Sequence, residues 1–200
     1  MYAVLSVTDK TGITELGAGL SRLGLRLVAT AGTAGLLREA GLDATVLGDL
    51  SGVPELMGGR VRAFHPTVFG GLLYRRGNPA DEADVRRHGV PRIDVLVCNF
   101  RDLPPDGASE GLLDSIDVGG PAMVRAAAKN HADVLPVVDP ADYGAVLGAL
   151  TAAGGRAGAT DPGFRRRLAV KAFARTAAYD RSVHRVLARL AQTGAEQPRT

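Results

Sequence analysis

The stretch "DVLVCN", residues 94–99, decides the fold. It holds four consecutive apolar residues and no alternation of polar and apolar positions. A strand that is apolar on both faces is typical of the centre of a parallel sheet, where helices cover both sides. We therefore predict a buried central strand here, and the rest of the sheet should be found on either side of it along the chain.

Further strands and helices alternate along the chain. Short apolar runs predict strands at 2–7, 25–29, 44–47 and 133–138. Helical spacing predicts helices at 13–23, 34–40, 81–88, 121–130 and 141–153, while the glycine- and arginine-rich residues 60–80 give no clear assignment. This alternation predicts an α/β fold of three layers, with a parallel sheet between helices. We expect one domain over 1–192, with C-terminal helices from about residue 162, and a disordered tail over 193–200.

Composition excludes several classes of protein. The chain is 46% hydrophobic and 22% charged, which is enough for a buried core. The single cysteine, Cys98, excludes an internal disulfide. A net charge of +3 with 4% aromatic residues and no tryptophan argues against a nucleic-acid partner. No apolar run reaches the roughly 18–20 residues of a membrane span. Since residues 1–10 resemble a strand more than a targeting signal, the expectation is a cytoplasmic protein.

Two strand ends carry the residues that a phosphate group requires. In parallel sheets, ligands bind beyond the carboxyl ends of the strands. Thr8, Lys10 and Gly12 follow the first strand, and residues 30–33 (TAGT) follow the second. Hydroxyls, glycines and a helix N-terminus together favour phosphate binding. The alternative is that Asp9, Thr30 and Thr33 only cap helices. Two such loops in one sheet favour the phosphate site.

The common catalytic and nucleotide signatures are absent from the sequence. There is no G-x-x-x-x-G-K-[ST], no G-x-G-x-x-G after a strand and no G-x-S-x-G. The four histidines form no metal-binding spacing with Cys98, so we expect no metal site. Taken alone, Cys98 is better interpreted as a small core residue than as a nucleophile.

The stretch "IDVGGPAMVRAAAKN", residues 116–130, combines a small apolar helix with three charges. Pro121 suits the first helical position. Arg125 and Lys129 are four residues apart and share a helix face, which costs about 0.2–0.5 kcal/mol unless an anion lies between them. Asp117 precedes the helix N-terminus, where a carboxylate is favourable. This pattern has two interpretations, a ligand site or a capping aspartate with two solvated bases.

Five stretches, in order, resemble one enzyme family over residues 2 to about 190. They are "LSVTDKTGI", "ATAGTAGLLREAG", "GVPELMGGRVRAFHPTVFGGLL", "IDVGGPAMVRAAAKNHADV" and "RLAVKAFARTAAYD". The family is the cyclohydrolase domain of the bifunctional purine-biosynthesis enzyme that joins a transformylase to an inosine-monophosphate cyclohydrolase. The resemblance implies a fold related to methylglyoxal synthase, a homodimer, and ring closure of a formamido-imidazole-carboxamide ribonucleotide without a cofactor. The transformylase part is not matched, so a separate transformylase is a possible partner.

The resemblance also implies roles for individual residues. The phosphate and ribose would be held by Thr8, Lys10, Thr30, Ala31, Gly32 and Thr33. The base would lie against Arg60, Val61, Arg62, Ala63 and the backbone of Cys98 and Asn99. Asp117, Val118 and Lys129 would lie at the reacting atoms, with Lys129 as proton carrier and Asp117 as its orienting partner.

Several positions depart from the family pattern. Arg62 and Ala63 stand where lysine and threonine are expected, and Phe69 replaces a histidine. Ala31 replaces a glycine, and Arg101 replaces a tyrosine of the catalytic site. Arg62 and Arg101 thus occupy two catalytic positions as permanent cations. Three interpretations follow: an inosine-monophosphate cyclohydrolase, a homologue that cyclises a related heterocyclic nucleotide in nucleoside-antibiotic biosynthesis, or a non-catalytic nucleotide-binding protein.

Overall fold

The computed structural model describes residues 1–53, 55–61, 63–103 and 112–193. Within these residues the strands form a five-stranded sheet in the order β3-β2-β1-β4-β5, and every neighbouring pair is parallel. The strands are β1 (Tyr2–Val7), β2 (Arg26–Ala29), β3 (Ala44–Val46), β4 (Ile93–Asn99) and β5 (Leu135–Val137). The stretch quoted first lies in β4, where all residues but the last are buried. The predicted parallel α/β fold is confirmed.

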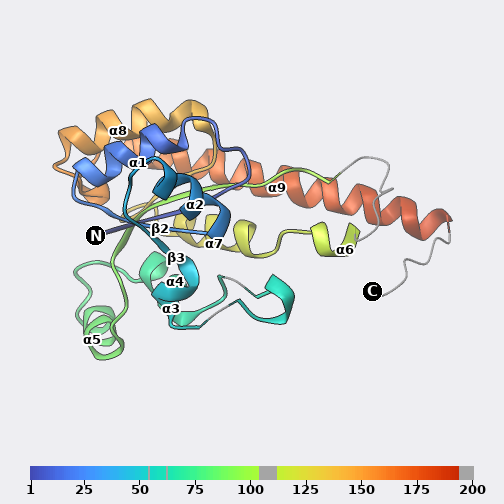
Figure 1. Ribbon diagram of the computed structural model, residues 1–200, viewed down its shortest axis with the longest axis horizontal. Helices are drawn as coiled ribbons and strands as arrows, with labels where there is room; N and C mark the ends of the chain where they lie inside the picture. Colours follow the sequence, from blue (N-terminus) through green and yellow to red (C-terminus); the bar gives the residue numbers. More distant parts are fainter. Residues whose placement is uncertain (54, 62, 104–111, 194–200) are drawn as a thin grey trace.

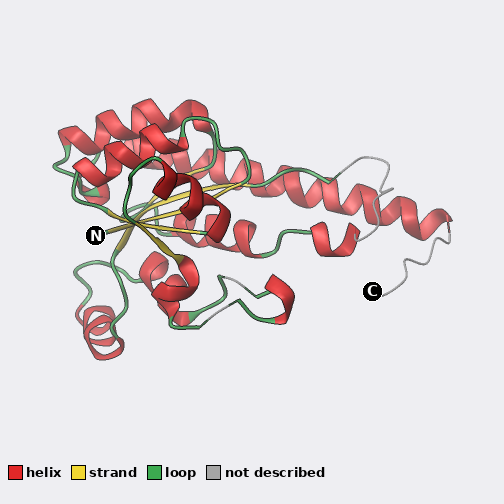
Figure 2. Ribbon diagram, viewed as in Figure 1, coloured by secondary structure: helices red, strands yellow, loops and turns green. Residues whose placement is uncertain are grey.

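Helices cover both faces of the sheet (Figures 1 and 2). One face carries α1 (Ile13–Arg22), α2 (Ala31–Glu39) and α8 (Tyr143–Ala152). The other face carries α3 (Leu47–Ser51), α4 (Pro66–Leu73) and α7 (Gly119–Lys129), and α9 (Pro162–Thr193) packs against α7 and β5. The remaining segments are α5 (Pro79–His88), α6 (Leu112–Ser115) and the 3-10 turns η1 (Met57–Gly59), η2 (Pro140–Asp142) and η3 (Ala157–Ala159).

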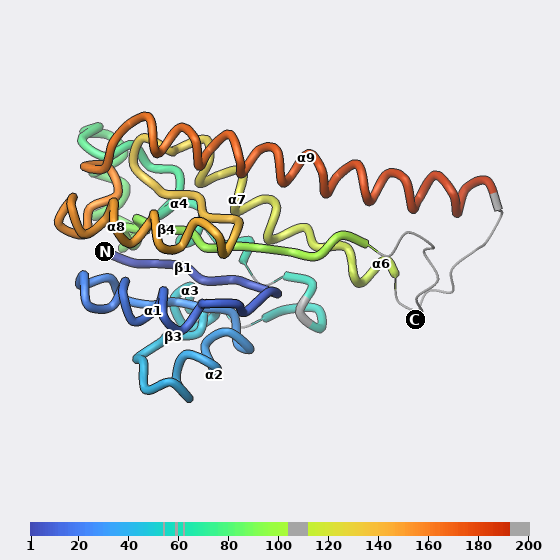
Figure 3. Tube along the Cα trace, turned by 90° about the horizontal axis from the view of Figure 1, so that it is seen from above, coloured from blue at the N-terminus to red at the C-terminus, as the bar shows by residue number. Residues whose placement is uncertain are grey.

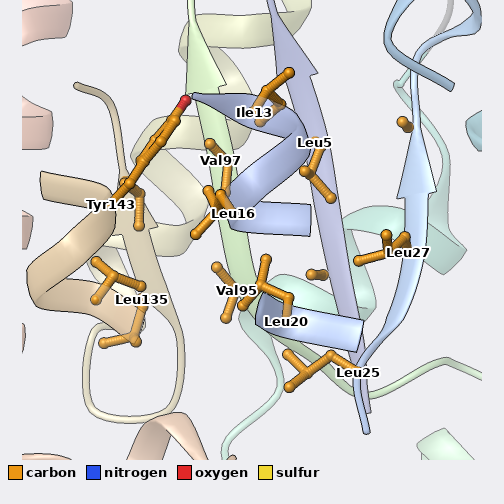
Figure 4. Close-up of a cluster of buried hydrophobic side chains, with 14 of the residues drawn as sticks. Leu5, Ile13, Leu16, Leu20, Leu25, Leu27, Val95, Val97, Leu135 and Tyr143 are labelled. Carbon is orange, nitrogen blue, oxygen red and sulfur yellow. The ribbon is translucent and has the colours of Figure 1, made fainter. Parts of the chain in front are cut away.

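β4 lies between β1 and β5, so the middle strand of the sheet is β1 and not β4 as predicted. The side chains on the two faces of β4 belong to two separate apolar clusters. On one side, Leu16 and Leu20 of α1 pack in one cluster with Val95 and Val97 of β4 (Figure 4). Cys98 belongs to the opposite cluster and is 1% exposed, and burial raises the pKa of its thiol. The run of four apolar residues in this strand, Val95–Cys98, thus follows from burial on both faces.

The C-terminal region is one helix where several were expected. α9 has 32 residues, so it is about 48 Å long at 1.5 Å per residue. Its C-terminal part extends beyond the α/β body (Figures 1 and 3). A small cluster of Leu103, Leu112 and Val186 packs along this extension. Apart from its first residue, which ends α9, the tail predicted over 193–200 lies outside the described residues.

Four of the five predicted helices, α2, α5, α7 and α8, start two or three residues away from the predicted position. α7 begins at Gly119, so Pro121 is its third residue and not its first. A proline is tolerated there because the first amides of a helix have no acceptor within the helix. α4 lies within residues 60–80, for which the sequence gives no clear assignment. His65 caps α4 by accepting the amide N–H of Thr67 at its Nδ1, at 3.2 Å, and histidine is not among the common capping residues.

We expect Gly71→Ala to lower the free energy of unfolding by about 1–3 kcal/mol. A Cβ at Gly71 would lie 2.5 Å from the carbonyl oxygen of Pro91 and 2.7 Å from Ile93 Cδ1, so α4 would have to move away from β4. Chemical denaturation measures the change. The control is Gly35→Ala in α2, where a Cβ meets nothing within 4 Å and helix propensity should raise stability. Equal stability of the two variants would contradict the close approach of α4.

Candidate active site

A large cavity opens at the carboxyl ends of β1 and β2. Its volume is about 1190 Å³, ample for a nucleotide-sized ligand. The walls come from the ends of β1, β2 and β4, from segment 55–64, from α6 and from the start of α7. Nine of the residues predicted for the site line it together: Thr8, Thr30, Ala31, Gly32, Arg60, Ala63, Asn99, Asp117 and Val118.

The start of α2 forms a polar end of the cavity. Thr30 precedes α2 with an extended backbone, and its side chain makes no capping hydrogen bond. The amides of Ala31 and Gly32 therefore have no acceptor in the helix, and both residues line the cavity. An uncapped helix N-terminus attracts a phosphate through these amides and the helix dipole. The capping alternative for Thr30 and Thr33 is wrong, since their hydroxyls lie 3.3 Å from each other.

Lys10 does not line the cavity, and its side chain contacts Thr33 in the first turn of α2. Its Nζ donates to the carbonyl oxygen of Val7 and, at 2.6 Å, to Oγ1 of Thr33. Thr33 is fully buried, and burial lowers the pKa of Lys10. Asp9 closes a local turn by accepting the amide of Thr11 at 2.9 Å, and α1 starts later, after Gly12. Lys10 thus places its charge beneath the loop that follows β1.

The side chain of Asn99 fixes the loop after β1. Its Oδ1 accepts the amides of Thr8 at 2.7 Å and Asp9 at 2.8 Å, and its Nδ2 donates to the carbonyl oxygen of Asp9 at 3.0 Å. These bonds use both ends of the amide, so Asn99 shapes the wall and positions Thr8. The preceding residue, Cys98, is buried and is not among the residues that line the cavity.

Asp117 combines the two roles that the sequence left open. Its Oδ1 accepts the amide of Gly120 at 2.9 Å, which caps α7, and the residue also lines the cavity. Its own amide donates to the hydroxyl of Tyr179 at 2.7 Å. Tyr179 comes from α9, is 2% exposed, and packs edge-on against Phe100. Sequence reasoning missed Tyr179, although it lies in the last of the five matching stretches.

The segment around residue 60 places fewer residues on the cavity wall than the resemblance implies. The guanidinium of Arg60 donates from Nε to Asp114 Oδ1 at 2.9 Å, and both side chains are more than half exposed. Ala63 is buried and lines the cavity, whereas Val61 pairs with Leu56 in an isolated bridge and does not line it. Arg62, a predicted catalytic residue, lies outside the described residues.

Arg101 lies at a second, smaller cavity. This cavity has a volume of about 420 Å³ and is formed by the ends of β1, β4 and β5 with α9. Asn99 lines both cavities, and Arg101 lines only the smaller one. The charge of Arg101 helps to lower the pKa of Asp9, mainly a result of the hydrogen bonds from Thr11. The predicted placement of Arg101 in the nucleotide cavity is therefore not found.

Lys129 lies far from Asp117 within one chain. It is the last residue of α7, about 15 Å along the helix axis from Gly119, and it is exposed. Arg125 is also exposed, with its guanidinium over the ring of Phe173 at 5.8 Å. Neither base lines the cavity. The two do share a helix face, but the chain does not bring Lys129 and Asp117 together.

The described residues contain no group of three or more His, Cys, Asp or Glu side chains arranged to hold a metal ion. Among the helices formed by these residues, none is long and apolar enough to span a membrane.

Two family models match the chain. The model described as "MGS-like domain" matches residues 12–122, and the model described as "AICARFT/IMPCHase bienzyme" matches residues 127–200. The "Bifunctional purine biosynthesis protein PurH" of Dinoroseobacter shibae is 50% identical over 185 residues, which are 90% of this chain and 34% of the relative. The PurH of Ruegeria pomeroyi is 47% identical over 98% of this chain and 37% of its own length. The chain thus spans about a third of these relatives.

A solved structure matches along almost its whole length. The crystal structure of ForH superposes with a TM-score of 0.88 at 45% identity, covering 94% of this chain and 98% of ForH. The MGS-like model covers more than half of the chain. The chain belongs to the MGS-like domain family and, within it, to the group that contains ForH and the IMP cyclohydrolase region of the bifunctional PurH enzymes.

Proposed function

We propose that the protein is a cyclohydrolase that closes the pyrimidine ring of a formamido-imidazole-carboxamide ribonucleotide, which gives inosine monophosphate and water. The observation that carries the proposal is that Asp117 and two helix starts face one cavity in a chain of this family. The amides at the start of α2 would bind the phosphate, and Thr8 would bind the ribose. The start of α7 would lie at the reacting groups.

The reaction requires proton transfer and stabilisation of an oxyanion. The carboxamide nitrogen bonds to the formyl carbon, and the formyl oxygen leaves as water with one proton from each of the two nitrogens. Oδ1 of Asp117 is used by Gly120, while Oδ2 has no hydrogen bond among the described residues and is available to accept a proton. The amides of Val118 and Gly119, at the start of α7, suit the developing oxyanion. A dehydration of this kind needs no metal or redox cofactor.

Proton delivery by Lys129 fits this proposal only through a second copy of the chain. Within one chain Lys129 is at the opposite end of α7 from Asp117. We therefore propose a homodimer in which the exposed Lys129 at the end of α7 in one copy reaches the cavity of the other. Asp117 then takes the role of proton acceptor in its own chain, which differs from the orienting role that the resemblance implies.

A second candidate is ring closure on a related heterocyclic nucleotide in nucleoside-antibiotic biosynthesis. The departures from the family pattern favour it. Ala63 lines the cavity where the family has threonine, and Arg101, in place of tyrosine, lines a different cavity. The shape and charge around the heterocycle therefore differ from those expected of the purine enzyme.

A cyclisation assay tests the proposal. The purified protein is mixed with the formamido-imidazole-carboxamide ribonucleotide, and inosine monophosphate is followed by absorbance and mass. Fast turnover supports the purine reaction, which needs a transformylase elsewhere to supply the substrate. Binding of inosine monophosphate without turnover would overturn it, and turnover of analogue heterocycles would then separate the second candidate from a non-catalytic nucleotide-binding protein.

A further inference from the structure

The wall of the large cavity includes an aromatic ring to which neither the sequence nor the comparisons assign a role. Phe64 lines the cavity and is 44% exposed. A phenylalanine this exposed leaves much of its apolar surface in water. Ligand cavities are lined mainly by apolar and aromatic side chains, so this surface is available to a ligand inside the cavity.

The chain holds the ring of Phe64 in a fixed orientation. Phe64 precedes His65, the residue that caps α4, and Phe69 is the fourth residue of that helix. A hydrophobic pair at these two positions is a staple that fixes how the chain enters a helix. The two rings stack with centroids 5.8 Å apart and planes at 10° to each other. Phe69 thus packs against the ring of Phe64 and restricts its orientation.

The residues around Phe64 are apolar or small and suit the base of a nucleotide. Gly119, the first residue of α7, lies beside the ring, since a Cβ there would be 3.8 Å from Phe64 Cε2. Met57 and Val118 line the same cavity, and their apolar side chains are exposed. The polar start of α2 lines this cavity too. A ligand that fills the cavity therefore combines an anionic end with a flat apolar ring.

We propose that Phe64, held by Phe69, is a stacking platform for the heteroaromatic ring of the bound nucleotide. This inference rests on the proposed function only in requiring that the cavity bind a nucleotide. Stacking on an aromatic side chain tolerates different rings because each ring has a π face. Phe64 therefore selects for an aromatic base without choosing between imidazole and other heterocycles, and the amides at the start of α7 lie at the edge of that base.

Calorimetric binding of two probes tests the platform. Inosine monophosphate carries a base, and ribose 5-phosphate has the same sugar and phosphate without one. We expect Phe64→Leu and Phe64→Ala to weaken inosine monophosphate about tenfold or more, and to change ribose 5-phosphate less than about twofold. Phe64→Tyr should keep wild-type affinity for both. Phe69→Leu, which weakens the staple, should give a smaller loss confined to inosine monophosphate.

The matched control is Phe173→Leu, because Phe173 is 41% exposed and does not line the cavity. It should change neither affinity. Equal losses for both probes, no loss for either, or no binding of inosine monophosphate by the wild-type protein would each overturn the platform. Thermal unfolding confirms that each variant is folded. Because binding is measured without turnover, a failed cyclisation assay with intact Phe64-dependent binding overturns only the proposed reaction.

Discussion

Replacing Asp117 by asparagine is expected to lower the rate of ring closure by at least about 100-fold, because a positioned acid–base group contributes this much or more. Asparagine keeps an oxygen that can accept the amide of Gly120, so the cap of α7 is retained. It loses the capacity to accept a proton. The affinity for inosine monophosphate should therefore change less than about threefold, and the loss should appear in kcat.

Asp161→Asn is the matched control for this variant. Asp161 also accepts an amide three residues ahead, that of Phe164 at 2.6 Å, but it does not line the cavity. Its replacement should leave turnover unchanged. If Asp117→Asn turns over at the wild-type rate, Asp117 only caps α7 and another group accepts the proton. If both variants lose activity together with thermal stability, the effect belongs to helix capping.

The sequence could predict features that depend on local pattern and on sheet topology. Four consecutive apolar residues required a strand buried on both faces, and β4 is that strand. Thr8 and Thr30 follow β1 and β2, Asn99 ends β4, and a parallel sheet brings such strand ends to one edge. These residues therefore line one cavity although they lie far apart in the chain.

Features that depend on packing between distant elements could not be predicted in this way. The periodicity of α7 places Arg125 and Lys129 on one face, but it does not say which end of the helix meets the ligand. Arg101 follows β4 and lines the smaller cavity, and no local sequence pattern indicates which of the two cavities it lines. Tyr179 reaches the amide of Asp117 only because α9 packs on α7.

The position of Lys129 leads to the second large effect. Since Lys129 lies at the far end of α7 from its own cavity, a catalytic Lys129 has to act on the cavity of another copy. In a two-fold dimer each cavity would then combine Asp117 of one chain with Lys129 of the other. Asp117→Asn and Lys129→Ala should each lower turnover by at least about 100-fold when assayed alone.

Mixing the two inactive variants should restore activity. In a mixed dimer one cavity carries both changes and the other carries neither, so random exchange of subunits should recover about a quarter of the wild-type rate. The measurement is turnover after the two variants are co-expressed with different tags or refolded together. Arg87→Ala, which removes an exposed base from α5, is the control and should be active alone. Two inactive variants that stay inactive when mixed would refute the shared site, and a fully active Lys129→Ala would remove Lys129 from the mechanism.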